Sequence, residues 1–167
     1  PQLRIQYDRM ITTVGGKLVE VGGPKRTTRE QLEAAIEPQT AGVHYLIPYT
    51  HFVAGLGLIH TDEEPLPLET VLEVAHAAGL PVIVDAAAQV YPPDNLTHFT
   101  KIGADLVAYG GKYFGSVNSS GLLVGRADLV AAARANSFIG FEADGVRTIG
   151  RAMKIDRQEV VAVYAAL

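Results

Sequence analysis

The 167-residue sequence has no cysteine, and none of its apolar runs approaches the ~20 residues that a membrane-spanning helix needs. Without cysteine, disulfides and thiolate metal sites are excluded from this sequence, which agrees with a reducing compartment. No charged-then-apolar leader opens the sequence, so no membrane partner is predicted and a cytoplasmic location is expected.

An excess of positive charge is also missing, since 14 Lys and Arg residues face 18 Asp and Glu residues. Nucleic acid is therefore not an expected partner, because its phosphates require a basic surface. The five histidines show neither helical i, i+4 pairing nor acidic companions at ligand spacing, so no metal site is predicted. With 48% hydrophobic residues, the chain can bury the core of one globular domain.

Short apolar runs alternate with amphipathic stretches along the chain, a pattern typical of parallel strands joined by crossover helices. We therefore predict an α/β domain with three α/β/α layers around a mainly parallel sheet. The predicted strands are residues 17–21, 41–47, 82–84, 105–109 and 121–125.

The amphipathic stretches predict helices that begin at caps or end at glycines. One helix follows a Thr27–Glu30 capping box, two end at Gly79 and Gly103, and two cover residues 127–136 and 156–167. For the last helix the pattern predicts an Asp156–Glu159 cap pair and a buried face of Val160, Val163, Tyr164 and Leu167. Residues 48–67 are predicted to form a long loop that contains His51 and His60.

Two polar residues follow predicted strands directly. Asp85 ends the strand at 82–84, and Lys112 follows the strand at 105–109 after Gly110 and Gly111. Ligands of open α/β sheets bind outside the carboxyl ends of the strands, so both residues lie where a cofactor is expected.

A phosphate loop does not explain the Gly-Lys pair. The Walker pattern requires a glycine five residues before that pair and a Ser or Thr after the lysine, whereas this chain has Leu106 and Tyr113. No strand is followed by G-x-G-x-x-G at the start of a helix, which disfavours a dinucleotide-binding module.

A carboxylate and an amine on neighbouring strand ends suit pyridoxal phosphate (PLP). The amine of Lys112 would form a Schiff base with the aldehyde, and Asp85 would keep the ring nitrogen protonated. Gly110 and Gly111 would let the backbone approach a flat cofactor, and small residues such as Ala87 would leave room beside its ring. Gln89 is a candidate hydrogen-bond partner of the phenolic oxygen, with a plain helix-start contact as the alternative.

Structural roles are open for the same residues. An aspartate after a buried strand often caps a helix or turn, and a lysine in a glycine turn is commonly just exposed. Arg147, Arg151 and Lys154 would form a solvated basic patch if they bind no anion.

Four stretches carry a family resemblance: PVIVDAAAQ (81–89), GADLVAYGGK (103–112), SGLLVGRADL (120–129) and IGRAMKIDRQEVVA (149–162). They are similar to the selenocysteine synthase-like group of fold-type-I PLP enzymes, which includes selenium transferases that act on seryl-tRNA and D-glucosaminate-6-phosphate ammonia-lyases. The DAAA run at 85–88 and the GRAMK run at 150–154 resemble the ammonia-lyase branch.

The resemblance implies a PLP-dependent lyase that eliminates a β-leaving group and ammonia from an amino acid or amino sugar acid. Asp85 would pair with the pyridine nitrogen, Lys112 would hold the cofactor and transfer the proton, and Arg151 would meet an anionic group of the substrate. A homodimer or larger homo-oligomer is expected. The alternatives are a selenium transferase and a non-catalytic module of the same fold.

The sequence departs from the family pattern at two places. Tyr109 replaces the usual serine three residues before the lysine, and Gly115, Ser116 and Val117 replace a glycine-proline-glutamine turn. By resemblance, residues 1–167 would form the central and C-terminal part of a PLP-binding large domain, without its N-terminal segment and small domain. The opening Pro1 and the final predicted helix without a stop signal agree with this expectation.

Overall fold

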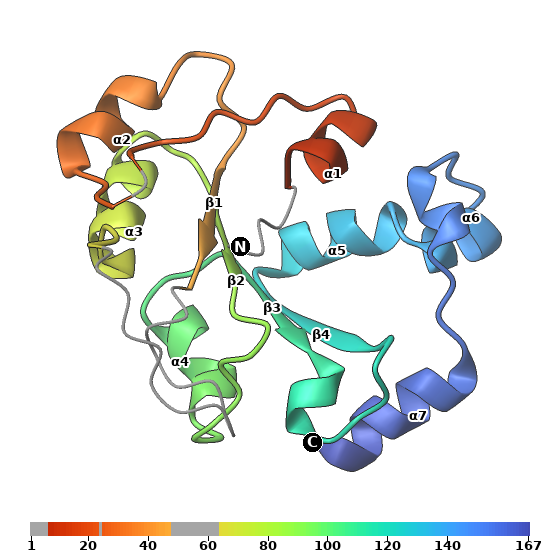
Figure 1. The fold of residues 1–167 in the computed structure, drawn as a ribbon. Coiled ribbons are helices and arrows are strands. Elements are labelled where there is room, and N and C mark those ends of the chain that lie inside the picture. Colours follow the sequence, from red (N-terminus) through yellow and green to blue (C-terminus); the bar gives the residue numbers. More distant parts are fainter. Residues whose placement is uncertain (1–6, 24, 48–63) are drawn as a thin grey trace.

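The computed structural model describes residues 7–23, 25–47 and 64–167, and its centre is a four-stranded sheet (Figure 1). Most of the predicted 48–67 loop, with His51 and His60, lies outside the described residues. The strands follow one another in the order β1 (Val43–Leu46), β2 (Val82–Asp85), β3 (Leu106–Gly110) and β4 (Gly121–Gly125).

Three of these strands are parallel, which confirms the mainly parallel α/β sheet. β1 pairs with β2, and β2 pairs with β3, each in parallel, while β4 runs antiparallel to β3. The helices α3 (Leu68–Ala77) and α4 (Asn95–Lys101) precede β2 and β3 respectively. Residues 111–120 between β3 and β4 include no long crossover helix, and such a short connection favours an antiparallel partner.

The hydrophobic core lies between one face of the sheet and α3. Val82, Val84 and Val107 are fully buried there, against α3 residues such as Leu72 and Ala75. Since side chains alternate along a strand, Ile83 and Asp85 point to the other face, where Ile83 is 38% exposed. The same alternation that buries the valines therefore keeps the Asp85 carboxylate out of the core.

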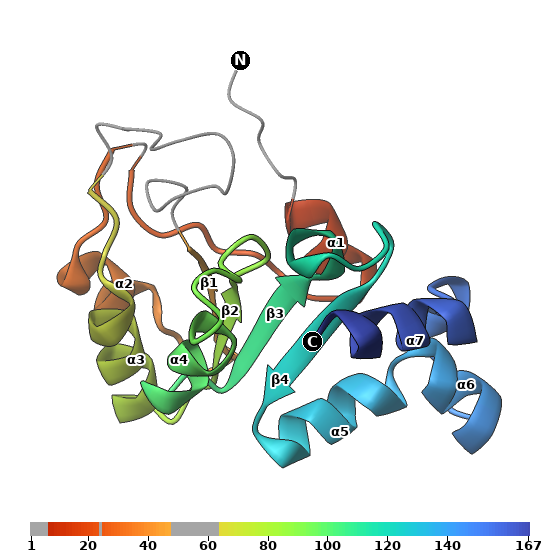
Figure 2. The same cartoon turned by 90° about the horizontal axis from the view of Figure 1, so that it is seen from below.

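Helices lie on both sides of the sheet (Figures 1 and 2). On the core side, α2 (Arg29–Ala35) packs beside α3, and α4 completes the layer. On the other side, α5 (Ala127–Ala135) packs beside β4. The remaining elements of the described residues are α1 (Tyr7–Thr13), η1 (Gly111–Phe114), α6 (Phe138–Asp144), η2 (Ile149–Ala152) and α7 (Arg157–Ala166).

The predicted glycine stops are confirmed, because α3 and α4 are followed by Gly79 and Gly103 with φ angles of +73° and +112°. At such angles a side chain would be strained, so these positions end the helices through backbone conformation. Among the described residues, no helix is long and apolar enough to cross a membrane.

Two local predictions near the N-terminus are wrong. Residues 17–21 form no strand, because their alternation specifies an extended segment but supplies no neighbouring strand; Val21 instead packs on the core while Val19 stays exposed. The capping box of α2 is Thr28 with Gln31, one residue beyond the predicted pair of Thr27 and Glu30.

For α7 the predicted cap is confirmed and the predicted buried face is wrong. Asp156 and Glu159 form a reciprocal capping box at its start. Val160, Tyr164 and Leu167 are 52%, 84% and 61% exposed in the described part of the chain. Periodicity identifies an apolar face, but only tertiary contacts decide which surface covers it.

A buried carboxylate joins three elements at the amino end of β3. Asp105, whose side chain is 7% exposed, accepts hydrogen bonds from the Val82 backbone N–H at 2.8 Å and from Arg126 Nη1 at 2.9 Å. His76 Nε2 on α3 lies 2.9 Å from the same carboxylate. Burial alone would raise the pKa of Asp105, but these hydrogen bonds outweigh it and hold that pKa below its usual value.

Candidate functional site

The carboxyl ends of β2 and β3 are held side by side beyond the regular sheet. The Ala86 N–H donates to the Ala108 carbonyl, and the Gly110 N–H donates to the Ala87 carbonyl, both at 3.0 Å. These two bonds continue the parallel pairing past Asp85, so the segment after β2 lies beside the segment that leads to Lys112.

Asp85 is the last residue of β2 and is half-buried. Its register places it opposite Leu46 on β1 and Ala108 on β3. One carboxylate oxygen accepts the Ala87 N–H at 3.0 Å, which fixes the orientation of the side chain. A local turn bond of this kind is the capping role considered from the sequence.

Lys112 is the second residue of the 3₁₀ turn η1 that follows β3 directly. Its side chain is exposed, and Nζ lies 5.1 Å from the centre of the Tyr113 ring. The structure thus brings the amine-bearing turn and the Asp85 carboxylate to neighbouring strand ends at the same edge of the sheet.

The neighbouring small residues serve the packing of the protein itself. A Cβ atom at Gly110 would lie 3.1 Å from the Tyr113 ring and 3.5 Å from the Ala87 carbonyl oxygen. Ala86 is buried, Ala87 is half-buried, and Gln89 is 8% exposed with its N–H bonded to the Ala86 carbonyl. The glycine lets the chain turn closely beside the Asp85–Ala87 segment.

Tyr109, at the position of the usual family serine, is a core residue. It is 2% exposed, and its hydroxyl donates to the Asn95 carbonyl at the start of α4 at 2.6 Å. Burial raises the pKa of Tyr109 to about 12. Since Tyr109 alternates with Ala108 along β3, its ring packs on the α4 side of the sheet, away from the face that carries Asp85.

The free energy of unfolding of the Tyr109→Phe variant at pH 7 is expected to be about 1 kcal/mol lower than that of the wild type, because the buried hydrogen bond to the Asn95 carbonyl is lost. Because the pKa is raised in the folded protein, wild-type stability is expected to fall as pH rises from about 10 toward 12. Urea unfolding of the wild type and the variant between pH 7 and pH 11 measures both effects. An equal loss of stability with rising pH in the two proteins would show that the Tyr109 hydroxyl is not its cause.

Arg151 lies in η2 and contacts α6. Its guanidinium lies 3.2 Å from Glu142 and stacks at 5.7 and 5.3 Å from the ring centres of Phe138 and Phe141. Lys154 lies over the same Phe138 ring. The Arg151 side chain therefore packs against α6, and its role toward an anionic substrate stays a prediction.

His44 is a neighbour of the site that the sequence pattern did not single out. It pairs with Ile83 in the sheet, two residues before Asp85, and so shares the Asp85 face. Burial lowers the pKa of His44, and the negative charge of Asp85 acts against that shift. Only the register between β1 and β2 reveals this proximity, so no local sequence signal could have found it.

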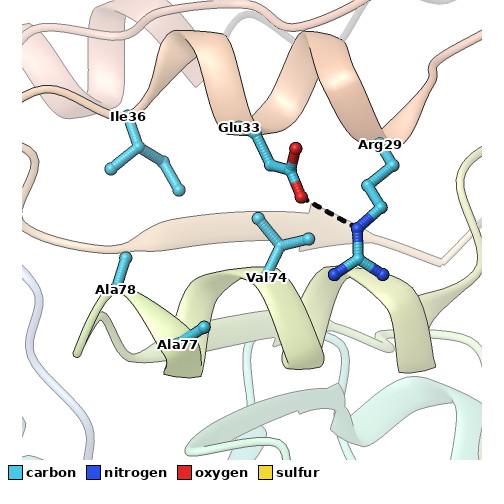
Figure 3. Close-up of a pocket in the computed structure, with 6 residues that line it drawn as sticks. All are labelled: Arg29, Glu33, Ile36, Val74, Ala77 and Ala78. Carbon is cyan, nitrogen blue, oxygen red and sulfur yellow. Dashed lines mark hydrogen bonds and ion pairs between the residues drawn. The ribbon is translucent and has the colours of Figure 1, made fainter.

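A shallow pocket lies elsewhere, between α2 and α3 (Figure 3). Its walls are Ile36, Val74, Ala77 and Ala78, and its charged residues are Arg29 and Glu33. Arg29 forms ion pairs at 2.8 Å with both Glu33 and Glu73. Its charges are thus already paired within the protein, and the pocket is separate from the edge that carries Asp85 and Lys112.

The sequence and fold are similar to known enzymes. The D-glucosaminate-6-phosphate ammonia lyase of Salmonella typhimurium is 35% identical over 98% of this chain and 39% of its own length. The 5'-C-glycyluridine monooxygenase-decarboxylase of a Streptomyces species is 33% identical over 95% of this chain and 35% of its own length. The L-seryl-tRNA(Sec) selenium transferase of Solidesulfovibrio magneticus is 29% identical over 92% of this chain and 31% of its own length.

A solved structure of D-glucosaminate-6-phosphate ammonia-lyase matches the fold with a TM-score of 0.69 and 34% identity, over 91% of this chain and 35% of that one. No family model matches the sequence. The chain spans 31–39% of the length of these relatives. In sequence and fold the chain is therefore similar to the selenocysteine synthase-like group of enzymes, with higher identity to the D-glucosaminate-6-phosphate ammonia lyase than to the selenium transferase.

Proposed function

We propose that the protein is a PLP-dependent lyase that removes the Cα proton and a β-leaving group from an amino acid or amino sugar acid by α,β-elimination. Hydrolysis of the resulting enamine by water then releases ammonia. The observation that carries the proposal is the pair of strand ends that bring the Asp85 carboxylate and the Lys112 amine to one edge of the sheet. The 35% identity to an ammonia lyase supports the reaction class.

The residues at this edge fit PLP by their chemistry. One oxygen of the Asp85 carboxylate accepts the Ala87 N–H at 3.0 Å, which orients an anionic side chain suited to pair with a protonated ring nitrogen. The Lys112 amine is exposed and can be reached by an aldehyde. Gln89 and the small residue Ala87 belong to the same segment and are proposed cofactor contacts, with Gly110 and Gly111 as the turn that carries the lysine.

In this proposal Lys112 has two tasks and Asp85 has one. Lys112 would hold the cofactor between turnovers, and its amine, once free, would take the proton from the substrate Cα. Asp85 keeps the ring nitrogen protonated by its negative charge. Bound PLP would supply an electron sink for the pair of electrons left at Cα.

We further propose that the substrate is a small amine-containing anion and that the protein is a homodimer or larger homo-oligomer, as is usual for enzymes of this fold. Residues 1–167 would correspond to the central and C-terminal part of the PLP-binding large domain. Arg151 is the proposed contact of the anionic substrate group, which would require it to exchange its ion pair with Glu142.

Reduction with borohydride tests the cofactor assignment. Full-length protein incubated with PLP and reduced is expected to carry a pyridoxyl group on Lys112, identified by peptide mass mapping. Absence of this adduct would favour a non-catalytic module of the same fold.

The reaction class is tested separately, because one relative is named a monooxygenase-decarboxylase. Ammonia release from amino acids and amino sugar acids in the absence of oxygen is expected for the lyase. Turnover that requires oxygen and releases carbon dioxide would overturn the lyase assignment, and a shift in the mobility of seryl-tRNA would favour a selenium transferase.

The Asp85→Ala variant is expected to lower turnover about 10²- to 10³-fold, because the charge that stabilises the protonated ring is lost. The Lys112 adduct should still form. Asp94→Ala is the matched control, since the Asp94 side chain forms no cap hydrogen bond at the start of α4. Equal turnover of the two variants would show that Asp85 is only a turn cap.

A further inference from the structure

The chain between Lys112 and β4 folds around one buried serine. Ser120 is 8% exposed and directly precedes β4. Its carbonyl accepts the Gly111 N–H at 2.8 Å, which anchors the first residue of the lysine turn to the start of β4. Gly111 itself is buried.

The contact between Gly111 and Ser120 leaves no room for a side chain. A Cβ atom at Gly111 would lie 2.1 Å from Ser120 Oγ and 3.0 Å from the Ser120 carbonyl oxygen. Real Cβ atoms essentially never approach a heavy atom within 3.0 Å, so an alanine at 111 must displace one of the two segments. The hydroxyl of Ser120 therefore limits where the lysine turn can lie.

The hydroxyl of Ser120 is itself held in place. It donates to the Val117 carbonyl at 2.7 Å and lies 3.0 Å from Ser116 Oγ, which can then donate to it. The Ser116 N–H donates to the Gly111 carbonyl at 2.9 Å. The hydrogen bonds thus form a closed ring that starts and ends at Gly111.

We infer that Ser120 is a positioning residue for Lys112, acting through its contact with Gly111. Lys112 follows Gly111 in the chain, and its exposed side chain receives little support from packing. The position of its Cα is therefore set by the backbone of η1. That backbone is held in place by the ring of hydrogen bonds through Ser120. Ser116, which bonds Ser120, is one of the three residues 115–117 that replace the family's glycine-proline-glutamine turn. The inference rests on the proposed role of Lys112 in the reaction.

Three variants of the full-length protein test this positioning: Gly111→Ala, Ser120→Ala and the double variant. Ser120→Ala removes the hydroxyl that an alanine at 111 would meet. In the double variant the tightest remaining contact is the 3.0 Å approach to the Ser120 carbonyl oxygen, which a small shift can relieve. Ser119→Ala is the matched control, because the neighbouring Ser119 hydroxyl is exposed and bonds Glu159 instead.

Two measurements report on Lys112 itself. In cofactor-free protein, competitive labelling with an amine reagent gives the reactivity of Lys112 relative to Lys101, an exposed lysine on α4. In protein incubated with PLP, the rate at which the Lys112 adduct forms is measured as a function of pH, with borohydride reduction to trap the adduct. Thermal unfolding is recorded for each variant to detect general loss of structure.

Gly111→Ala is expected to slow adduct formation about 10- to 100-fold, because a displacement of about 1 Å has effects of that size. In the Ser120→Ala background, Gly111→Ala is expected to slow adduct formation less than about tenfold, since the effects of substitutions at contacting residues are not additive. Ser120→Ala alone is expected to shift the relative labelling and the pH profile of Lys112, and Ser119→Ala to leave both unchanged.

If Gly111→Ala slows adduct formation by the same factor in the wild-type and the Ser120→Ala background, the inference is overturned. So would variants with a lower unfolding temperature but wild-type Lys112 labelling and pH profile, which would show a purely structural role. If Gly111→Ala fails to fold, Ser120→Ala against Ser119→Ala still decides the question. A wild-type protein that forms no adduct would refute the proposed function instead, whereas the labelling of cofactor-free protein would still test the positioning.

Discussion

Replacing Lys112 by alanine in the full-length protein is expected to abolish the borohydride-trapped pyridoxyl adduct and to lower turnover about 10²- to 10⁴-fold. The loss follows from the removal of an amine that both holds the cofactor and moves a proton. Lys112→Arg is the sharper variant, because it keeps the positive charge but has a guanidinium that stays protonated. Both variants should therefore be equally inactive in the ammonia-release assay.

Lys101→Ala is the control, since Lys101 is an exposed lysine in the last turn of α4. It should retain the adduct and wild-type turnover. Continued ammonia release by Lys112→Ala at the wild-type rate, or an adduct that maps to another lysine, would sink the assignment of Lys112. Activity retained by Lys112→Arg alone would mean that charge, rather than nucleophilic chemistry, is what position 112 supplies.

The free energy of unfolding of the Asp105→Ala variant is expected to be about 3 kcal/mol lower than that of the wild type, because the Val82 N–H is left buried without its acceptor and Arg126 loses its buried anion. Asp105→Asn should lose less, since its amide oxygen can still accept from Val82. Urea unfolding at pH 7 measures both. This carboxylate lies at the amino end of β3, so its effect should appear in stability rather than in the chemistry at the opposite strand ends.

The stabilisation by Asp105 is also expected to depend on pH. Its folded-state pKa lies below the ordinary value, so the unfolded chain binds the proton more readily than the folded chain. The stabilisation is complete above the ordinary pKa of about 4 and is lost as pH falls through the lower folded pKa. The difference in stability between wild type and Asp105→Asn should therefore shrink below pH of about 4.

Asp128→Asn is the matched control for Asp105, because Asp128 binds the same Arg126 from an exposed position. Exposed ion pairs contribute little, so this variant should unfold at nearly the wild-type urea concentration. A loss of stability as large as that of Asp105→Ala would mean that Arg126, rather than the buried carboxylate, is the important member of the cluster.

Local patterns in the sequence determined most of the architecture. The apolar run before Asp85, the run before Gly110 and the glycines that end α3 and α4 specify strands and helices through interactions within a few residues. These same runs place Asp85 and Lys112 just past two strands. Parallel strands end at the same edge of a sheet, so their proximity followed from the order of elements alone.

Long-range contacts decided the rest, because hydrophobic periodicity shows which face is apolar but not what covers it. Val160 and Tyr164 on α7 match a buried stripe and yet are exposed, and residues 17–21 alternate like a strand without a pairing partner. Tyr109, a departure from the family pattern, is explained only by its hydroxyl bond to the Asn95 carbonyl.

The tertiary structure likewise decides which polar residues are hydrogen-bond partners, which the sequence does not show. Asp105 is distant in sequence from His76 and Val82. The pairing of β2 with β3 brings it to Val82, and the packing of α3 on the sheet brings it to His76. The contact between Gly111 and Ser120 also depends on β4 folding back along β3. The sequence by itself therefore determined which residues carry the proposed chemistry, and the tertiary structure decided what holds them in place, since such packing involves segments that meet only in the folded chain.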